Sequence, residues 1–259
     1  MPVRTERRGN IYVVTLDRPE AKNAVDGPTA DEIHAAFLEF EADGKLSVAV
    51  LHGANGIFCA GADLKSIGTD RQPKLTAEGN APMGFSRLTL SKPVIGAVEG
   101  YAVAGGFELA MWCDLRVAAK DAVFGIFCRR WGVPLLDGGT IRLTRMIGMS
   151  RAMDLILTGR GVSGEEALQM GVANRIVEKG KALEAALELA GQLTAFPQQC
   201  MRSDRLAIIE NIGLPLDEAH ANEFRRGMNV INSGETLAGA QKFAGGAGRH
   251  GSFSEFTKK

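Results

Sequence analysis

The sequence lacks the features that mark several classes of protein. Lys and Arg together number 30, as do Asp and Glu, so the chain has no net charge at pH 7. Without an excess of basic residues there is no field to attract nucleic acid or anionic lipid, which argues against nucleic-acid partners and an RNA-binding function. The N-terminal residues MPVRTERRGN are polar and lack the apolar stretch of a signal peptide. Residues 93–113 are the most apolar region, but Glu99 and Glu108 interrupt them, which argues against a membrane span. We therefore expect a cytoplasmic protein without membrane contact.

Cysteine and histidine are few and scattered. The chain has four of each, namely Cys59, Cys113, Cys128 and Cys200, and His34, His52, His220 and His250. None of them forms a CxxC pair, a Cys/His ligand spacing or a triad motif, so we predict reduced thiols and no metal site. A dinucleotide fingerprint is also missing, and the sequence implies no permanently bound cofactor.

The pattern that is present alternates between strand and helix. Two apolar segments on either side of Gly9-Asn10 predict a hairpin, and Pro28 opens a helix that Gly44 closes. The apolar runs 47–53 and 94–100 predict buried strands. Later segments, 115–119 and 123–124, predict further strands. This alternation indicates an α/β core.

The second half of the chain becomes helical. Ser163 and Glu166 form a capping box before a helix that Gly171 ends. A later helical stripe contains Leu216, His220, Phe224 and Ile231. We divide the chain into an α/β core at residues 1–195 and a helical module at residues 196–259.

Two glycine-containing turns stand out in the core. In GYAVAGGFELAMWCD, Gly105 and Gly106 separate a short strand from a helix that begins near Glu108. The first N–H groups of a helix have no internal partner, and glycine lets a ligand approach them closely. Gly61-Ala62-Asp63 repeats this pattern after the strand at 47–53. Either both are ordinary turns, or one N–H from each grips a carbonyl oxygen as an oxyanion hole.

The two turns lie in segments that resemble a known family. GIFCAGADLKSI and KPVIGAVEGYAVAGGFELAMWCDLRVA closely resemble the crotonase (enoyl-CoA hydratase/isomerase) superfamily. LDRPEAKNAV, GGTIRLTRMIGMSRAMDLILTGR and EEALQMGVANRIV extend the resemblance over most of the chain. It implies a crotonase-like (ββα)n spiral core with a C-terminal helical trimerisation module, and an acyl-CoA substrate whose coenzyme A enters as part of the thioester.

The resemblance also implies roles for individual residues. The N–H groups of Ala62 and Gly105 would bind the thioester oxygen as an enolate forms. Segments near the first helix and the second turn would hold coenzyme A through Ala21, Lys22, Ala60, Asp63, Leu64 and Lys65. Two of these have a structural alternative, because Lys22 suits a solvated surface position and Asp63 suits a helix N-cap.

Three residues decide the chemistry. Glu108 aligns with one of the two glutamates that hydratases use on water; alternatively it is a solvated or ion-paired helix residue. Cys128 stands where hydratases carry the second glutamate. It is either a catalytic acid whose pKa Arg129 and Arg130 lower, or a small residue lining the pocket. Asp137 lies near a catalytic aspartate of non-hydratase relatives, and also suits the N-cap of the next helix.

The C-terminal module implies assembly. In relatives such helices pack on neighbouring subunits, so we expect a homotrimer or a homohexamer. Phe243, with Lys242 or Arg249, would help enclose coenzyme A of the next subunit; simple helix packing and a solvated tail are the alternative. The polar loop 69–87 is long enough to suggest a function, and we expect it to line the acyl pocket.

We therefore expect an enoyl-CoA hydratase-like enzyme. Because Cys128 replaces the second glutamate, two alternatives stay open. One is an enoyl-CoA isomerase or acyl-CoA hydrolase that uses Asp137, and the other is an acyl-CoA-binding protein with little turnover.

Overall fold

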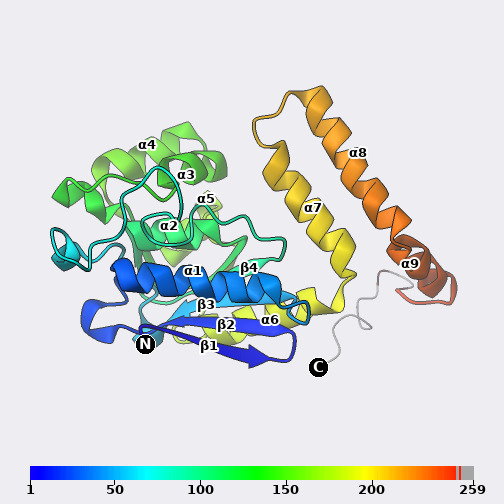
Figure 1. Cartoon of the computed structure of the whole chain (residues 1–259), viewed down its shortest axis with the longest axis horizontal. Helices are drawn as coiled ribbons and strands as arrows, with labels where there is room; N and C mark the ends of the chain where they lie inside the picture. Colours follow the sequence, from blue (N-terminus) through cyan, green and yellow to red (C-terminus); the bar gives the residue numbers. More distant parts are fainter. Residues whose placement is uncertain (249–250, 252–259) are drawn as a thin grey trace.

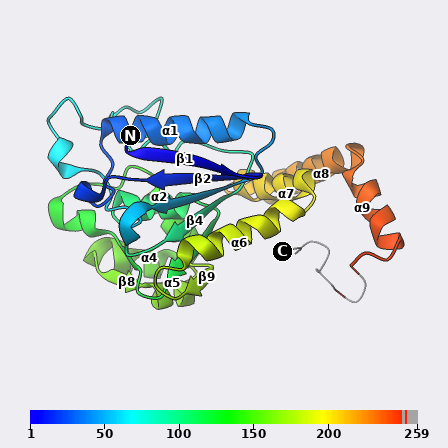
Figure 2. The same cartoon turned by 90° about the horizontal axis from the view of Figure 1, so that it is seen from below.

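A computed structural model describes residues 1–248 and residue 251 of the chain. A mixed α/β core carries an arm of three helices that projects to one side (Figures 1 and 2). The strands are β1 (Val3–Arg8), β2 (Ile11–Leu16), β3 (Val48–Gly53), β4 (Val94–Val98), β5 (Tyr101–Val103), β6 (Leu115–Ala119), β7 (Val123–Gly125), β8 (Gly161–Ser163) and β9 (Arg175–Val177). The helices are α1 (Gly27–Ala42), α2 (Gly105–Trp112), α3 (Gly139–Ile147), α4 (Met149–Thr158), α5 (Gly164–Met170), α6 (Ala182–Ala195), α7 (Gln198–Asn211), α8 (Leu216–Asn232) and α9 (Glu235–Ala244). The α/β core expected from the sequence is confirmed.

The main sheet has six strands in the order β1-β2-β3-β4-β6-β9. The predicted hairpin forms, because β1 pairs antiparallel with β2 and places Val3 opposite Leu16. All further neighbours in this sheet run parallel. Parallel neighbours require crossover connections, and these bring the carboxyl ends of β3 and β4 to one edge, where the glycine turns follow.

Helices cover both faces of this sheet, which explains its continuous apolar strands. In β3, Val48 and Val50 pack with α6, whereas Ala49 and Leu51 belong to the larger cluster that contains residues of α1 and α2. Side chains alternate between faces along a strand, so a strand buried on both sides has no polar positions. Figure 2 shows α1 and α6 on opposite sides of the sheet.

A second sheet has the strand order β5-β7-β8, and its strand β5 leads into α2, the helix that carries Glu108. β5 pairs parallel with β7, and α2 follows β5 after a single residue. The helix begins at Gly105 itself, three residues earlier than the sequence suggested, so both glycines belong to its first turn. The turn at Gly61, by contrast, leads only into a single 3-10 turn, Leu64–Ser66, and then into a long irregular loop.

The local helix signals later in the chain are confirmed. Ser163 is the N-cap of α5, where its Oγ accepts a hydrogen bond from the Glu166 N–H at 3.2 Å. Gly171 ends that helix in the left-handed conformation. Such caps satisfy backbone groups that a helix end would otherwise leave unpaired.

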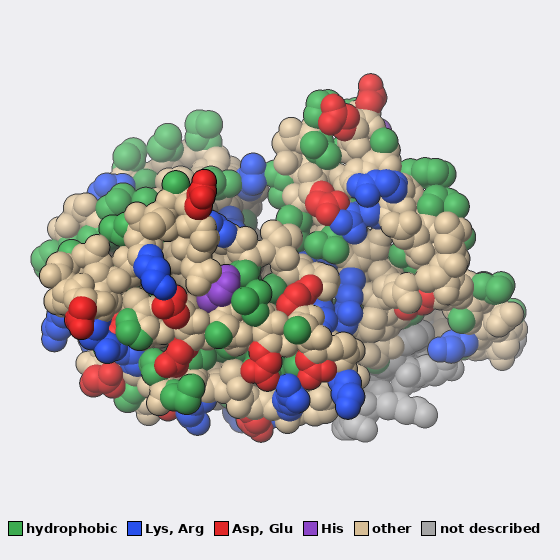
Figure 3. Space-filling view, viewed as in Figure 1, with side chains coloured by type: hydrophobic (Ala, Val, Ile, Leu, Met, Phe, Trp, Pro, Cys, Tyr) green, Lys and Arg blue, Asp and Glu red, His purple; other side chains and the backbone are tan. Residues whose placement is uncertain are grey.

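The arm formed by α7, α8 and α9 leaves apolar side chains uncovered. Phe224 and Leu216 on α8 are each 71% exposed, and Ile208 on α7 is 69% exposed. A second exposed apolar group lies on α4, where Met149 and Leu157 project. Figure 3 shows hydrophobic side chains gathered near α4 and along α8. Across the described residues, no helix combines the length and the apolarity that a membrane crossing requires.

Lys92 fastens the C-terminal end of α1 to the sheet. Its buried ammonium donates hydrogen bonds to the carbonyl oxygens of Phe40 at 2.7 Å, Glu41 at 3.1 Å and Asp43 at 2.7 Å. The last carbonyls of a helix have no internal partner, and a cation there also suits the helix dipole. Lys92 therefore supplies the hydrogen-bond donors that water would provide at an exposed helix end.

We predict that Lys92→Met lowers the free energy of unfolding by about 2–3 kcal/mol, because it leaves buried carbonyls without a donor. Chemical denaturation monitored by circular dichroism measures this loss. Lys74→Met is the matched control, because Lys74 pairs with Asp31 at the surface and should change stability by less than about 0.5 kcal/mol. Equal losses in the two variants would contradict the structural role of Lys92.

Candidate active site

Two backbone turns meet at the edge of the core with little between them. The backbone at Cys59 pairs with β5 through a parallel bridge. The Cys59 N–H donates to the Tyr101 carbonyl at 2.9 Å, and the Cys59 carbonyl accepts from the Val103 N–H at 3.1 Å. A Cβ on Gly106 would collide with the carbonyl oxygen of Cys59, and a Cβ on Gly61 would lie 2.9 Å from the Gly105 nitrogen. Glycine is therefore required for this close approach.

The approach leaves two N–H groups together and unused. A Cβ placed on Gly105 would lie 3.5 Å from the Ala62 nitrogen, so the two turns are in contact. Within the described part of the chain, neither the Ala62 N–H nor the Gly105 N–H donates a hydrogen bond. Two adjacent donors, one of them in the first turn of α2, suit an oxygen that gains negative charge.

Ala104 sets the direction of this helix start. Its backbone lies at φ 53° and ψ −126°, which a residue with a Cβ rarely adopts. Hydrogen bonds fix it on both sides: its N–H donates to the Gly125 carbonyl at 2.8 Å, and its carbonyl accepts from the Phe107 N–H at 3.0 Å. Strain of this kind typically costs about 1–3 kcal/mol and collects at functional sites.

The second turn is tied to the N-terminal segment. The Ala60 N–H donates to the Lys22 carbonyl at 3.1 Å, which places residues 21 and 22 beside the turn. Asp63 is the N-cap of the 3-10 turn, and it also pairs with Arg18 at 3.0 Å, so its alternative role as a cap is confirmed. The Lys22 side chain forms no hydrogen bond or ion pair with any described residue, as expected for a solvated lysine or one that awaits a ligand.

Glu108 lies one turn into α2 and is only 3% exposed. Its Oε1 accepts hydrogen bonds from the Gly139 N–H at 2.7 Å and the Asp137 N–H at 2.9 Å. Burial outweighs these bonds and raises the pKa of Glu108 to about 7. The Glu108 carboxyl can thus hold or release a proton near neutral pH, and the solvated or ion-paired alternative is wrong.

The expectation that Asp137 caps the next helix is wrong. This residue is not the N-cap of α3, because that position belongs to Gly138 and carries no side-chain cap. Its Oδ1 instead accepts hydrogen bonds from Ser86 Oγ at 2.9 Å and from the Met83 N–H at 3.3 Å. Burial raises the pKa of Asp137 above its ordinary value, against these two bonds. Its carboxylate therefore anchors the segment 83–86.

Cys128 lies in a 3-10 turn, Phe127–Trp131, and is 7% exposed. Burial, followed by the charge of Glu108, raises the pKa of this thiol. The charge of Arg129 lowers the pKa, as expected, but too weakly to offset these two effects. The Arg129 Nε donates a hydrogen bond to the Ile156 carbonyl at 3.0 Å, and the Arg130 guanidinium lies 4.1 Å from the Phe127 ring centre. Cys128 is a neutral thiol near pH 7, which fits a lining residue.

These groups line one cavity of about 490 Å³. Eight of the residues expected from the sequence line it: Ala60, Ala62, Asp63, Leu64, Gly105, Glu108, Cys128 and Asp137. Loop 69–87 contributes Gln72, Pro73, Leu75, Pro82 and Met83, so the expectation that it lines this pocket is confirmed. Most of the wall is apolar, and the polar groups cluster around Glu108, as in typical small-molecule sites.

Four of the expected residues do not line this cavity. Ala21, Lys22 and Lys65 lie outside it. Phe243 is 68% exposed on α9, where it lines a separate hollow with Lys242 near the start of α7. Arg249 lies outside the described residues. Residues 1–248 and 251 also contain no group of three or more His, Cys, Asp or Glu side chains that could hold a metal ion.

Sequence reasoning missed Met83, Trp131 and Arg142. Met83 covers Gly105, since a Cβ on that glycine would collide with the Met83 sulfur, and Trp131 lines the cavity although it is 70% exposed. Arg142 donates to the Asp137 carbonyl at 2.8 Å and to the Ser86 carbonyl at 3.0 Å. The only local signal for Arg142 is its position one turn after Gly138-Gly139.

Comparisons with known proteins agree on one family. The family described as enoyl-CoA hydratase/isomerase matches residues 6–245. An enoyl-CoA hydratase of Mycobacterium tuberculosis, EchA19, is 35% identical, with 92% of each chain covered. A carnitinyl-CoA dehydratase of Salmonella heidelberg is 37% identical over 92% of this chain and 93% of its own. The crystal structure of enoyl-CoA hydratase EchA1 from Mycobacterium marinum superposes with a TM-score of 0.89 at 38% identity, covering 94% of this chain and 95% of that one.

We predict that Glu108→Gln stabilises the fold at pH 8 relative to wild type by up to about 3 kcal/mol, and much less at pH 4. The folded protein holds the Glu108 proton up to about pH 7, whereas an unfolded chain releases it near its ordinary pKa of 4.5. Wild-type stability therefore falls as pH rises between these values, and glutamine removes this dependence. Denaturant unfolding at a series of pH values measures the difference between the two proteins, and a difference that did not vary with pH would contradict the raised pKa.

Proposed function

The chain belongs to the enoyl-CoA hydratase/isomerase family, and we propose that it adds water to a 2-enoyl-CoA thioester. Its crotonase-like fold, expected from the sequence, is shown by the superposition on solved hydratases. The observation that supports hydration is the meeting of two unused N–H groups, at Ala62 and Gly105, with the buried carboxyl of Glu108 in one apolar cavity.

The two N–H groups would receive the thioester carbonyl oxygen. As a water oxygen attacks the β-carbon, electrons move from the double bond to that oxygen and an enolate forms. Donors already pointing at this oxygen stabilise the enolate without any rearrangement. The removal of one such donor typically costs about 2.7–4 kcal/mol of barrier.

Glu108 would move both protons of the reaction. Its ionised carboxylate removes a proton from the attacking water, and its neutral form then returns a proton to the α-carbon, so that one water molecule is added in total. A single carboxyl can serve in both directions when its pKa lies near the working pH, and the pKa of Glu108 is about 7. This arrangement dispenses with the second glutamate, whose position Cys128 occupies.

Coenzyme A would enter as part of the substrate, with no permanently bound cofactor. Residues 60–64 reach the cavity, and Ala21-Lys22 lies beside them just outside it, where the Ala60 N–H donates to the Lys22 carbonyl at 3.1 Å. Both segments would hold coenzyme A through backbone groups, with Lys22 free to meet a phosphate. Phe243 and Lys242 would contact the coenzyme of a neighbouring subunit.

An alternative use of the same site is double-bond isomerisation or thioester hydrolysis through Asp137. In its favour, Asp137 lines the same cavity and burial raises its pKa. Against it, hydrogen bonds from Ser86 and Met83 engage its carboxylate. An acyl-CoA-binding protein with little turnover is the second alternative, because the usual second glutamate is missing.

We predict that the protein hydrates crotonyl-CoA or a longer 2-enoyl-CoA, seen as loss of the conjugated enoyl-thioester absorbance. Glu108→Gln should lower kcat by about 10²–10⁴-fold, because it removes the proton carrier and keeps the shape. The wild-type kcat/KM should rise with pH and level off above about pH 7, where Glu108 is ionised.

Asp137→Asn is the matched comparison for this experiment. If Asp137→Asn abolishes turnover and Glu108→Gln does not, the isomerase or hydrolase alternative replaces hydration. If wild type binds acyl-CoA but consumes neither substrate, the binding-protein alternative holds.

We further propose that residues 196–259 pack copies of the chain into a homotrimer or a homohexamer, and that the core ends at residue 195. The arm exposes one apolar face, with Phe224 and Leu216, and the core exposes another, with Met149 and Leu157. Two different apolar faces on one chain suit a head-to-tail contact that closes into a ring.

We predict that Phe224→Asp shifts the protein from a trimer or hexamer to a monomer, measured by analytical ultracentrifugation. The reason is that a charge in a desolvated contact lacks a partner. Glu165→Ala on the exposed surface of α5 is the control and should leave the assembly unchanged. A wild-type protein that sediments as a monomer would refute this assembly.

A further inference from the structure

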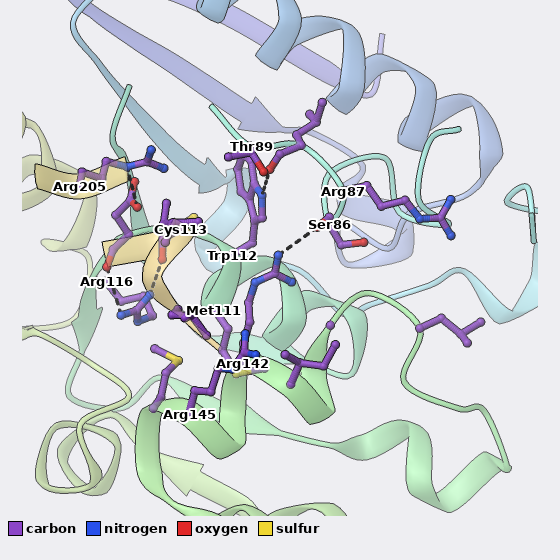
Figure 4. A pocket seen from close by; sticks show the side chains of 18 residues that line it. Ser86, Arg87, Thr89, Met111, Trp112, Cys113, Arg116, Arg142, Arg145 and Arg205 are labelled. Carbon is purple, nitrogen blue, oxygen red and sulfur yellow. Dashed lines mark hydrogen bonds and ion pairs between the residues drawn. The ribbon is translucent and has the colours of Figure 1, made fainter. Parts of the chain in front are cut away.

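A second cavity lies behind the active site. It has a volume of about 480 Å³ and is bounded by α2, α3, α7 and the segment 86–89. Its lining residues include Met111, Trp112, Arg142, Arg145, Arg205 and Ile209. Figure 4 shows that Arg142 reaches from α3 across this cavity towards Ser86. Since Leu136 lines both cavities, the wall between them is thin.

Arg142 connects the segment that contacts Glu108 with the segment that covers Gly105. One guanidinium nitrogen donates to the Asp137 carbonyl at 2.8 Å, and the other donates to the Ser86 carbonyl at 3.0 Å. The Asp137 N–H is itself a donor to Glu108 Oε1. The segment 83–86 is the one that Asp137 anchors, and its Met83 covers Gly105 of the paired donors. A rigid fork of two donors suits such a cross-link.

Arg142 also acts on the same groups through its charge. Its guanidinium lowers the pKa of Glu108 and of Asp137, and both carboxyls in turn favour the charged guanidinium. The other charged or titratable groups facing this set are Cys128 near Glu108, Arg87 near Asp137, and Cys113 and Arg145 near Arg142. On Glu108, Arg142 therefore opposes the effects of burial and of the Asp137 charge.

We propose that Arg142 is a positioning residue, which holds the Asp137 and Ser86 segments in place and supplies the positive charge that lets Glu108 ionise inside an apolar cavity. Its effect on turnover rests on the proposed hydration, but its effect on the Glu108 proton does not. Because Arg142 lines the second cavity, removal of its side chain leaves space that a small cation from solution can enter.

The first test measures the Glu108 proton directly. Infrared spectra of wild type over a pH series, with Glu108→Gln as the reference that lacks this group, give the protonation midpoint of Glu108. In Arg142→Ala the midpoint should rise by about one pH unit, because a positive charge near the carboxylate has gone. In Arg142→Lys, which keeps a charge without the fork, the rise should be smaller.

The second test asks whether the lost group can be supplied from outside. Guanidinium ion, at concentrations far below those that unfold proteins, should return the Glu108 midpoint of Arg142→Ala towards the wild-type value. If the protein hydrates enoyl-CoA, Arg142→Ala should lose about 10²-fold in kcat with little change in KM, and guanidinium should restore part of it. Arg145→Ala is the matched control, because Arg145 lies on the same helix and lines the same cavity but bonds to no described residue.

The outcomes separate the two proposals. A raised midpoint that guanidinium lowers supports the role of Arg142, even in a protein without hydratase activity, which would refute only the proposed function. An unchanged midpoint in a folded Arg142→Ala overturns the inference, as does an equal shift in Arg145→Ala. If Arg142→Ala does not fold, the midpoint of Arg142→Gln decides, because glutamine removes the charge and keeps a hydrogen-bond donor; an unchanged midpoint in folded Arg142→Gln would refute the proposal.

Discussion

The site depends on the close approach of two backbones. The segment that ends at Ala62 must lie against the first turn of α2, and no side chain can stand between them. Gly106 meets this constraint against the Cys59 carbonyl, and Gly61 meets it against Gly105. Each segment is fixed by its own sheet or bridge, so the approach is a property of the whole α/β core. The paired donors, the position of Glu108 and the shape of the cavity all follow from it.

The ionisable side chains near these donors are buried and have little contact with solvent. Burial pushes Glu108 and Asp137 towards their neutral forms, while N–H groups and Arg142 favour their ionised forms. These opposed effects leave the pKa of Glu108 near 7, which neither burial nor hydrogen bonding alone would give. Burial and the charge of Glu108 raise the pKa of Cys128, so this thiol stays neutral near pH 7.

Much of the fold could be predicted because its signals are local. The β1–β2 hairpin, the Ser163 cap and the apolar β3 each follow from a few adjacent residues. The glycine turns also marked where Ala62 and Gly105 come together. The direction of the Asp137 side chain and the position of Arg142 could not be predicted, because Ser86 and Met83 hold them from more than fifty residues away. The start of α2 was misjudged because glycine is unfavourable inside an isolated helix, whereas here the tertiary contact requires it. Cytoplasmic location stays a prediction.

The paired donors at Ala62 and Gly105 belong to the backbone, and this has a consequence for evolution. Ordinary substitutions at either position keep the N–H group, so this pair of unused donors tolerates drift in sequence better than a pair of side chains would. The groups beside these donors in the cavity are side chains at 108, 128 and 137, and a single codon change can replace any of them. Changes at these three positions can therefore alter the acid and base groups of the cavity while the paired backbone donors are kept.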